Sequence, residues 1–271
     1  MGFVKRKGTK ATKTLPADFE DIKDTFVSKV QGMIQEHHIP DSFVLNFDQT
    51  GCHMVPGGEW TMGEMGSALV TIAGLDDKRQ MTALLIVMKS GWMLLPQLIY
   101  VGKTDRCLPK CVVFPESWDL TCTESLWSNK GSMVLFAEKI LLPYINGVRE
   151  SPHSVTNRRW LFLISSGPTR APTSNVSYAT MASVKHRLQP LDLTVNFEYK
   201  ENIKSCFHEW YSAQVVPPLD DDAKDMTAVT QVNMKTSNMK PLHAEWIIAT
   251  HSKMEDRREQ IQAGFRKAGP L

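Results

Sequence analysis

The sequence predicts a mixed α/β fold in which helices cover a single sheet. Three observations predict it: strand-like segments cluster in the first half, an amphipathic helix and a short apolar strand follow, and the remainder has helical periodicity. The chain has 271 residues and is 42% hydrophobic, which is enough for one good core and a small appendage. We therefore expect one main domain.

The first half begins with a helix and continues as a meander of strands. Apolar residues recur at steps of three and four over residues 16–36, which is typical of an amphipathic helix. The next segment, SFVLNFD, alternates as a strand that ends at Asp48, and the Gln-Thr-Gly after it predicts a turn. Residues 68–104 predict two or three antiparallel strands, with turns at residues 75–78 and 89–92.

The second half is mostly helical. Residues 128–148 predict a helix that ends near Pro143 or Gly147, and the apolar run WLFLIS then predicts a short buried strand that meets a turn. A long amphipathic helix is expected over residues 194–215, beginning just after Asp192. Two further helices are expected in the tail, over residues 241–253 and 254–269.

Basic residues are concentrated in two acid-poor segments. The net charge of +2 says little about partners, but the first fourteen residues carry five lysines and arginines, and residues 151–191 hold no Asp or Glu. The lysines near the amino terminus also fit a solvated flexible tail. We predict nucleic-acid contacts at Lys5, Arg6, Lys7, Arg158, Arg159, Arg170, Lys185 and Arg187.

The cysteines and the most apolar run argue against a zinc-binding protein and against a membrane-spanning one. Five cysteines without a secretory leader favour a reducing compartment, and the Cys107 to Cys111 spacing lacks the second ligand pair of a zinc site. Residues 81–100 are interrupted by Lys89 and Pro96, so they do not supply the ~20 continuous apolar residues of a membrane span. We expect no membrane association and no small-molecule substrate.

Two carboxylates stand at the ends of predicted elements, Asp48 after a strand and Asp192 before a long helix. If the sheet brings them together, they can hold a hard divalent cation such as Mg²⁺, which prefers oxygen ligands. Taken singly, each has an ordinary explanation, because Asp48 suits a turn and Asp192 suits a helix N-cap.

Six segments together resemble a known family. They are VLNFDQTG, WTMGEMGS, VTIAGLDDKRQMTALL, LLPQLIYVGKT, WSNKGSM and LQPLDLTVNFEYK. In this order they are similar to the DDE-superfamily endonuclease domain of pogo and jerky-type, mariner-related transposases, from about Phe3 to the carboxyl end. The resemblance implies an RNase H-like fold, a mixed sheet flanked by helices. We therefore expect a basic tail over 1–15, the RNase H-like domain over 16–215, and an acidic loop with a helical extension over 216–271.

The resemblance also implies three aspartates that bind Mg²⁺ for DNA strand cleavage and transfer. The first carries over to Asp48 and the third to Asp192, in the LQPLD motif. The second does not carry over, because Ser165 stands at its position after the apolar strand, and a neutral hydroxyl is a far weaker ligand for a hard dication. The interval between Ser165 and LQPLD is also shorter than the family leads us to expect. Together these departures predict a degenerate site that holds Mg²⁺ poorly.

Three functions remain open on the sequence alone. The first is a transposase-derived domain that binds DNA, without sequence specificity because the family's upstream helix-turn-helix modules are not expected here. The second is a residually active Mg²⁺-dependent endonuclease that uses Asp48 and Asp192. The third is a non-enzymatic scaffold or transposon remnant. Nuclear localisation follows from the resemblance alone.

Overall fold

The structure of the chain is a computed structural model that describes residues 17–56, 77–150, 161–165, 176–180, 188–215 and 232–269. Its centre is a six-stranded sheet of order β4-β3-β2-β1-β5-β6. The strands are β1 (Val44–His53), β2 (Gln80–Met88), β3 (Gln97–Val101), β4 (Asp119–Thr123), β5 (Leu161–Ser165) and β6 (Val176–Thr180).

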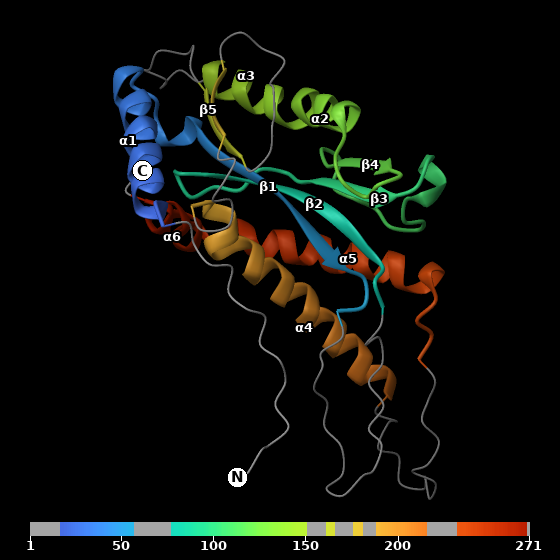
Figure 1. Cartoon of the computed structure of the whole chain (residues 1–271). Coiled ribbons are helices and arrows are strands. Elements are labelled where there is room, and N and C mark those ends of the chain that lie inside the picture. The colour runs from blue at the N-terminus through green and yellow to red at the C-terminus, as the bar shows by residue number, and fades with distance from the viewer. Residues whose placement is uncertain are drawn as a thin grey trace, which may run out of the picture.

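Helices cover both faces of this sheet (Figure 1). They are α1 (Phe19–Glu36), α2 (Lys130–Phe136), α3 (Leu142–Glu150), α4 (Asn196–Val215), α5 (Thr236–Glu255) and α6 (Arg258–Ala268), with π-helical turns at Ala137–Leu141 and Leu191–Val195. In Figure 1, α2 and α3 lie on one side of the sheet and α4, α5 and α6 on the other. Alternate side chains of β1 therefore meet different helices.

The strand directions confirm the predicted α/β class and the RNase H-like arrangement. β1, β2 and β3 pair antiparallel as a meander, whereas β5 pairs parallel to β1 and β6 pairs parallel to β5. The chain passes from the β4 side of the sheet to β5 through α2 and α3. β1 and β5 consequently point the same way, and β5 ends opposite Phe47, near the middle of β1.

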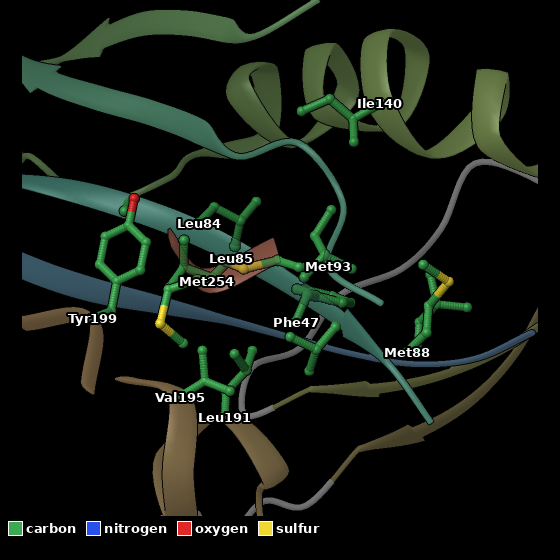
Figure 2. Close-up of a cluster of buried hydrophobic side chains, with 14 of the residues drawn as sticks. Phe47, Leu84, Leu85, Met88, Met93, Ile140, Leu191, Val195, Tyr199 and Met254 are labelled. Carbon is green, nitrogen blue, oxygen red and sulfur yellow. The ribbon is translucent and has the colours of Figure 1, made fainter. Parts of the chain in front are cut away.

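The core lies on both faces of the central strands. β2 is buried from Met81 to Met88, as expected of a strand whose two faces are both covered by helices. Figure 2 shows Leu84 and Leu85 between Ile140 on one side and Val195 on the other. The tail helices join the same core through a set of fully buried side chains: Ile247 and Met254 of α5, and Ile261 and Phe265 of α6.

One boundary prediction is wrong, because β1 continues five residues beyond Asp48. The Gln-Thr-Gly segment pairs residue by residue with β2, as far as His53 opposite Gln80. Its turn-like composition is overridden by these ladder hydrogen bonds.

The predicted helix end near Pro143 or Gly147 is also wrong. The helix runs through both residues as α2, a π-helical turn and α3, and it reaches Glu150. A proline inside a helix lacks the N–H of the regular ladder and its ring crowds the preceding turn. The wider π-helical turn at Ala137–Leu141 ends two residues before Pro143, and the regular ladder is already interrupted there.

Most of the remaining elements agree with the sequence, but β4 (Asp119–Thr123) and β6 (Val176–Thr180) were not predicted, and the start of α4 differs at Asp192. α1, α5 and α6 fall where helices are predicted, and the turn at residues 89–92 contains Gly91 at φ +92°. The short interval after Ser165 contains β6. Asp192 lies inside the π-helical turn Leu191–Val195 rather than before the helix, because that turn runs on directly into α4.

Candidate functional site

The two predicted metal ligands, Asp48 and Asp192, lie side by side. Asp48 is in β1, and Asp192 is in the π-helical turn that leads into α4. The Nδ2 atom of Asn196 donates hydrogen bonds to both, at 3.1 Å to Asp48 Oδ2 and 2.9 Å to Asp192 Oδ1. The two carboxylate oxygens are therefore no farther apart than the sum of these distances.

Buried polar contacts fix the Asp192 turn against β1. Asn46, two residues before Asp48 and on the same face of the strand, accepts a hydrogen bond from the Leu191 backbone N–H at 2.9 Å. Gln189 donates from Nε2 to the Phe47 carbonyl oxygen at 3.2 Å. Both side chains are buried, so the LQPLD motif is held by groups that have been removed from water.

A glycine of α6 allows the same turn to be packed closely from its other side. A Cβ at Gly264 would lie 2.6 Å from Thr194 Oγ1 and 2.7 Å from the Pro190 carbonyl oxygen. Only a residue without a side chain fits this contact. The position of Asp192 thus depends on β1 and on α6 together.

Ser165, which stands at the position of the family's second aspartate, ends β5 beside β1. Its backbone is in register with Phe47, the residue before Asp48, in the parallel β1–β5 pair. The three positions that the resemblance assigns to aspartates therefore belong to elements that adjoin β1 near its middle, β5 through the Ser165–Phe47 register and the Asp192 turn through Asn196. The roles of Asp48, Asp192 and Ser165 stay predictions.

The described residues fit one divalent ion better than two. Asp48 and Asp192 supply two carboxylates, and Mg²⁺ is commonly held by one or two carboxylates with waters in the other positions. A two-ion site needs more anionic ligands than this pair. Among the residues that the structure describes, no three His, Cys, Asp or Glu side chains come together as a metal site.

A cleft of about 280 Å³ opens further along α4 and was missed by the sequence reasoning. Its polar lining includes Lys200 and Lys204 of α4, His53 at the end of β1, and the carboxylates of Asp77 and Glu201. Lys200 and His53 are exposed, and Lys204 lies 3.9 Å from Glu201. The spacing of four residues through Asp192, Asn196, Lys200 and Lys204 was a readable signal, because such residues share one helix face.

Two titratable groups of this cleft have displaced pKa values. Burial raises the pKa of the Cys52 thiol to about 12, so this side chain is a neutral thiol and not a nucleophile at neutral pH. The hydrogen bonds from Arg79 lower the pKa of Asp77 below its ordinary value. Asp77 therefore stays ionised, and its carboxylate forms an ion pair with Arg79 rather than with Lys200 or Lys204.

The eight predicted nucleic-acid contacts lie outside the described residues, which begin at residue 17 and omit residues 151–160, 166–175 and 181–187. They are Lys5, Arg6, Lys7, Arg158, Arg159, Arg170, Lys185 and Arg187. In the part of the chain that is described, no helix combines the length and apolar character needed to cross a membrane.

No protein-family model and no curated protein matches the chain. Solved structures of Mos1 transposase are similar to it. The paired-end complex with the left transposon end is 12% identical, with 98% of this chain and 67% of that chain covered and a TM-score of 0.45. The pre-cleavage Mos1 transpososome is 11% identical, with 100% and 69% covered and a TM-score of 0.44. The Mos1 mariner paired-end complex with Mn is 13% identical, with 98% and 68% covered and a TM-score of 0.44.

Proposed function

We propose that this chain is a nucleic-acid-binding domain derived from a pogo or jerky-type transposase, and that its DNA cleavage site is degenerate. The observation that carries the proposal is the meeting of Asp48 and Asp192 at Asn196, beside a β5 strand that ends in Ser165 and not in a carboxylate. The carboxylate pair supports the ancestry suggested by the sequence motifs. The serine supports the loss of efficient cleavage.

DNA is the partner that this proposal assigns, without sequence specificity. The cleft along α4 supports it, because Lys200 and Lys204 follow Asp192 by eight and twelve residues on one helix. At about 1.5 Å per residue, Lys200 is about 12 Å further along the helix axis from the carboxylate pair. Lysine ammonium groups in a cleft attract backbone phosphates irrespective of the base sequence. Nuclear localisation is part of the same proposal.

The DNA-binding half is tested by fluorescence anisotropy on a random-sequence duplex in EDTA. Binding should weaken steeply between about 50 and 200 mM salt, since neutralised phosphates release counterions. The double variant Lys200→Ala and Lys204→Ala should lower the salt slope by about 2, one for each lost phosphate contact. Lys103→Ala, an exposed lysine beyond β3 that pairs with Glu124, is the matched control and should leave the slope unchanged. Absence of DNA binding by the native chain would refute the proposal.

The degenerate-site half is tested by cleavage of supercoiled plasmid with Mg²⁺ or Mn²⁺. We expect no nicking by the native chain, and we expect Ser165→Asp to restore it because this variant supplies the third carboxylate. Adding Asp48→Ala to Ser165→Asp should abolish the restored activity. Nicking by the native chain that disappears in Asp48→Ala would instead establish a residually active endonuclease.

A further inference from the structure

Asn196 is the most unusual polar side chain of the site. It is only 5% exposed, and its Nδ2 group donates to the carboxylates of both Asp48 and Asp192. Its other amide atom, Oδ1, is buried and accepts no hydrogen bond from any residue that the structure describes. Both N–H groups of the amide are therefore hydrogen-bonded, whereas its oxygen has no donor among the described residues.

This orientation is the one that a metal-free site requires. Two carboxylates attract hydrogen-bond donors, and an NH₂ group has two hydrogens, one for each acceptor. The cost is the buried Oδ1, since a buried acceptor without a donor costs about 1–3 kcal/mol. The amide oxygen and nitrogen exchange places by a half-turn about the Cβ–Cγ bond, a torsion with a broad energy profile.

A bound divalent ion would favour the opposite orientation of the Asn196 amide, with Oδ1 and not Nδ2 toward the two aspartates. An ion bound by both carboxylates would lie close to the amide of Asn196, because Nδ2 is 3.1 Å from Asp48 Oδ2 and 2.9 Å from Asp192 Oδ1. There an N–H group would be repelled, whereas an amide oxygen is an accepted ligand of hard cations. Resting on the proposed function, in which Asp48 and Asp192 are what remains of a cleavage site, we propose that Asn196 turns its Oδ1 toward the ion and serves as the third oxygen ligand, with Asp48 and Asp192. The site would then hold one ion with a neutral ligand in place of a third carboxylate.

The test is a calorimetric titration of the full chain with Mn²⁺ in the absence of DNA. Native protein, Asn196→Ala, Asn196→Asp and the control Asn202→Ala are compared, each first checked for its circular dichroism spectrum and thermal unfolding. Asn202 is a matched control because it is an asparagine of the same helix whose Nδ2 faces Met254 Sδ at 3.8 Å. We expect Asn196→Ala to weaken Mn²⁺ binding by about tenfold or more, and Asn202→Ala to leave it unchanged.

Asn196→Asp tests whether the side chain at this position reaches the ion, because it removes the N–H donors and keeps an oxygen. A carboxylate that reaches the ion adds a charged ligand, so Mn²⁺ binding should tighten by about tenfold although the hydrogen bonds to Asp48 and Asp192 are lost. The metal-free variant should have a lower melting temperature, because three carboxylates repel one another, and Mn²⁺ should raise it. Native affinity in Asn196→Ala, or weaker binding in Asn196→Asp, would overturn the inference.

The same preparations distinguish this inference from the proposed function. DNA binding in EDTA does not require the metal, so it is measured beside each titration. A native chain that binds DNA but gives no Mn²⁺ signal overturns the ligand role and leaves the DNA-binding proposal standing. Mn²⁺ binding that depends on Asn196, in a chain without DNA affinity, supports the ligand role and refutes the proposed partner.

Discussion

The Asn46 side chain in β1 accepts a hydrogen bond from the Leu191 backbone N–H at 2.9 Å, and this contact joins the two segments that carry the candidate aspartates. Asn46 is two residues before Asp48, and Leu191 is one residue before Asp192. Asn46, whose side chain accepts this hydrogen bond, is fully buried. Placement of the carboxylate pair is therefore coupled to the stability of the fold.

We expect Asn46→Ala to lower the free energy of unfolding by about 1–3 kcal/mol, because the Leu191 N–H loses its acceptor in the interior. The Asp192 turn should loosen at the same time, so Mn²⁺ affinity should also fall. Urea denaturation followed by tryptophan fluorescence measures the first effect, and calorimetry measures the second. Asn202→Ala, which removes a weak contact from α4 to Met254 of α5, should stay within about 0.5 kcal/mol of the native chain. Native stability in Asn46→Ala would contradict this role.

Gly264→Ala should destabilise the chain by about 1–3 kcal/mol, because an added methyl group overlaps the backbone of the Asp192 turn. The clash is with the Pro190 carbonyl oxygen, which lies 2.7 Å from the point that a Cβ would occupy, and α6 has to move away to relieve it. Thermal unfolding measures the loss.

Gly147→Ala in α3 is the opposite case and serves as the control for Gly264→Ala. A Cβ there meets no atom within 4 Å, so alanine should stabilise the helix by about 0.5–1 kcal/mol. Equal effects of the two substitutions would show that the Gly264 contact does not constrain the turn.

How much could be predicted from the sequence depended on whether a feature was local. The helix over α1 and the strand that ends in Ser165 follow from local periodicity, whereas the approach of Asp48 to Asp192 was expected only from the family resemblance. The end of β1 was misjudged because Gln-Thr-Gly is a turn signal locally, while nine consecutive pairs with β2 extend the strand to His53. Pairing with a distant strand of this kind cannot be predicted from the residues of the segment alone.

The two candidate features that the sequence reasoning missed, Asn196 and the cleft at Lys200, are tertiary in origin. Asn196 gains its significance only when β1 is brought against the start of α4, and the cleft at Lys200 needs the end of β1 as its second wall. The four-residue spacing from Asp192 onward places these side chains on one helix face. It does not reveal that this face meets Asp48.

The buried Asp119 carboxylate at the start of β4 should make a large contribution to stability. It is 0% exposed, accepts a hydrogen bond from Gln97 Nε2 at 2.6 Å and forms an ion pair with Lys139 Nζ at 2.8 Å. Asp119→Ala leaves the Gln97 amide without this acceptor and removes the partner of Lys139. We expect a loss of about 2–4 kcal/mol, measured by urea denaturation.

Glu124→Ala removes the carboxylate of a different pair and is the control for Asp119→Ala. Its partner Lys103 lies 3.5 Å away, and both side chains are more than two-thirds exposed. Exposed pairs contribute little, so a change within about 0.5 kcal/mol is expected. If Asp119→Ala were equally mild, the Asp119 cluster would not anchor β4 to the helix that carries Lys139.

His243 in α5 should make the fold sensitive to acid. It is 0% exposed, and burial lowers its pKa to about 4 against the opposing effect of the His53 backbone. In the unfolded chain the pKa of histidine is about 6.5. Between these two values the unfolded state binds a proton that the folded state does not, so stability is fully present above about pH 6.5 and falls as the pH is lowered toward about 4.

Replacement of His243 by leucine removes this proton-binding difference. We expect the stability lost between about pH 6.5 and 4 to be smaller in His243→Leu than in the native chain by up to about 3 kcal/mol. Urea denaturation at several pH values in this window measures the slope. His251, whose pKa is also lowered to about 4 by burial, remains in the variant and keeps part of the acid sensitivity. His208→Gln changes an exposed ring of α4 and should leave the slope as it is in the native chain. An unchanged slope in His243→Leu would show that His243 is not the source of the acid sensitivity.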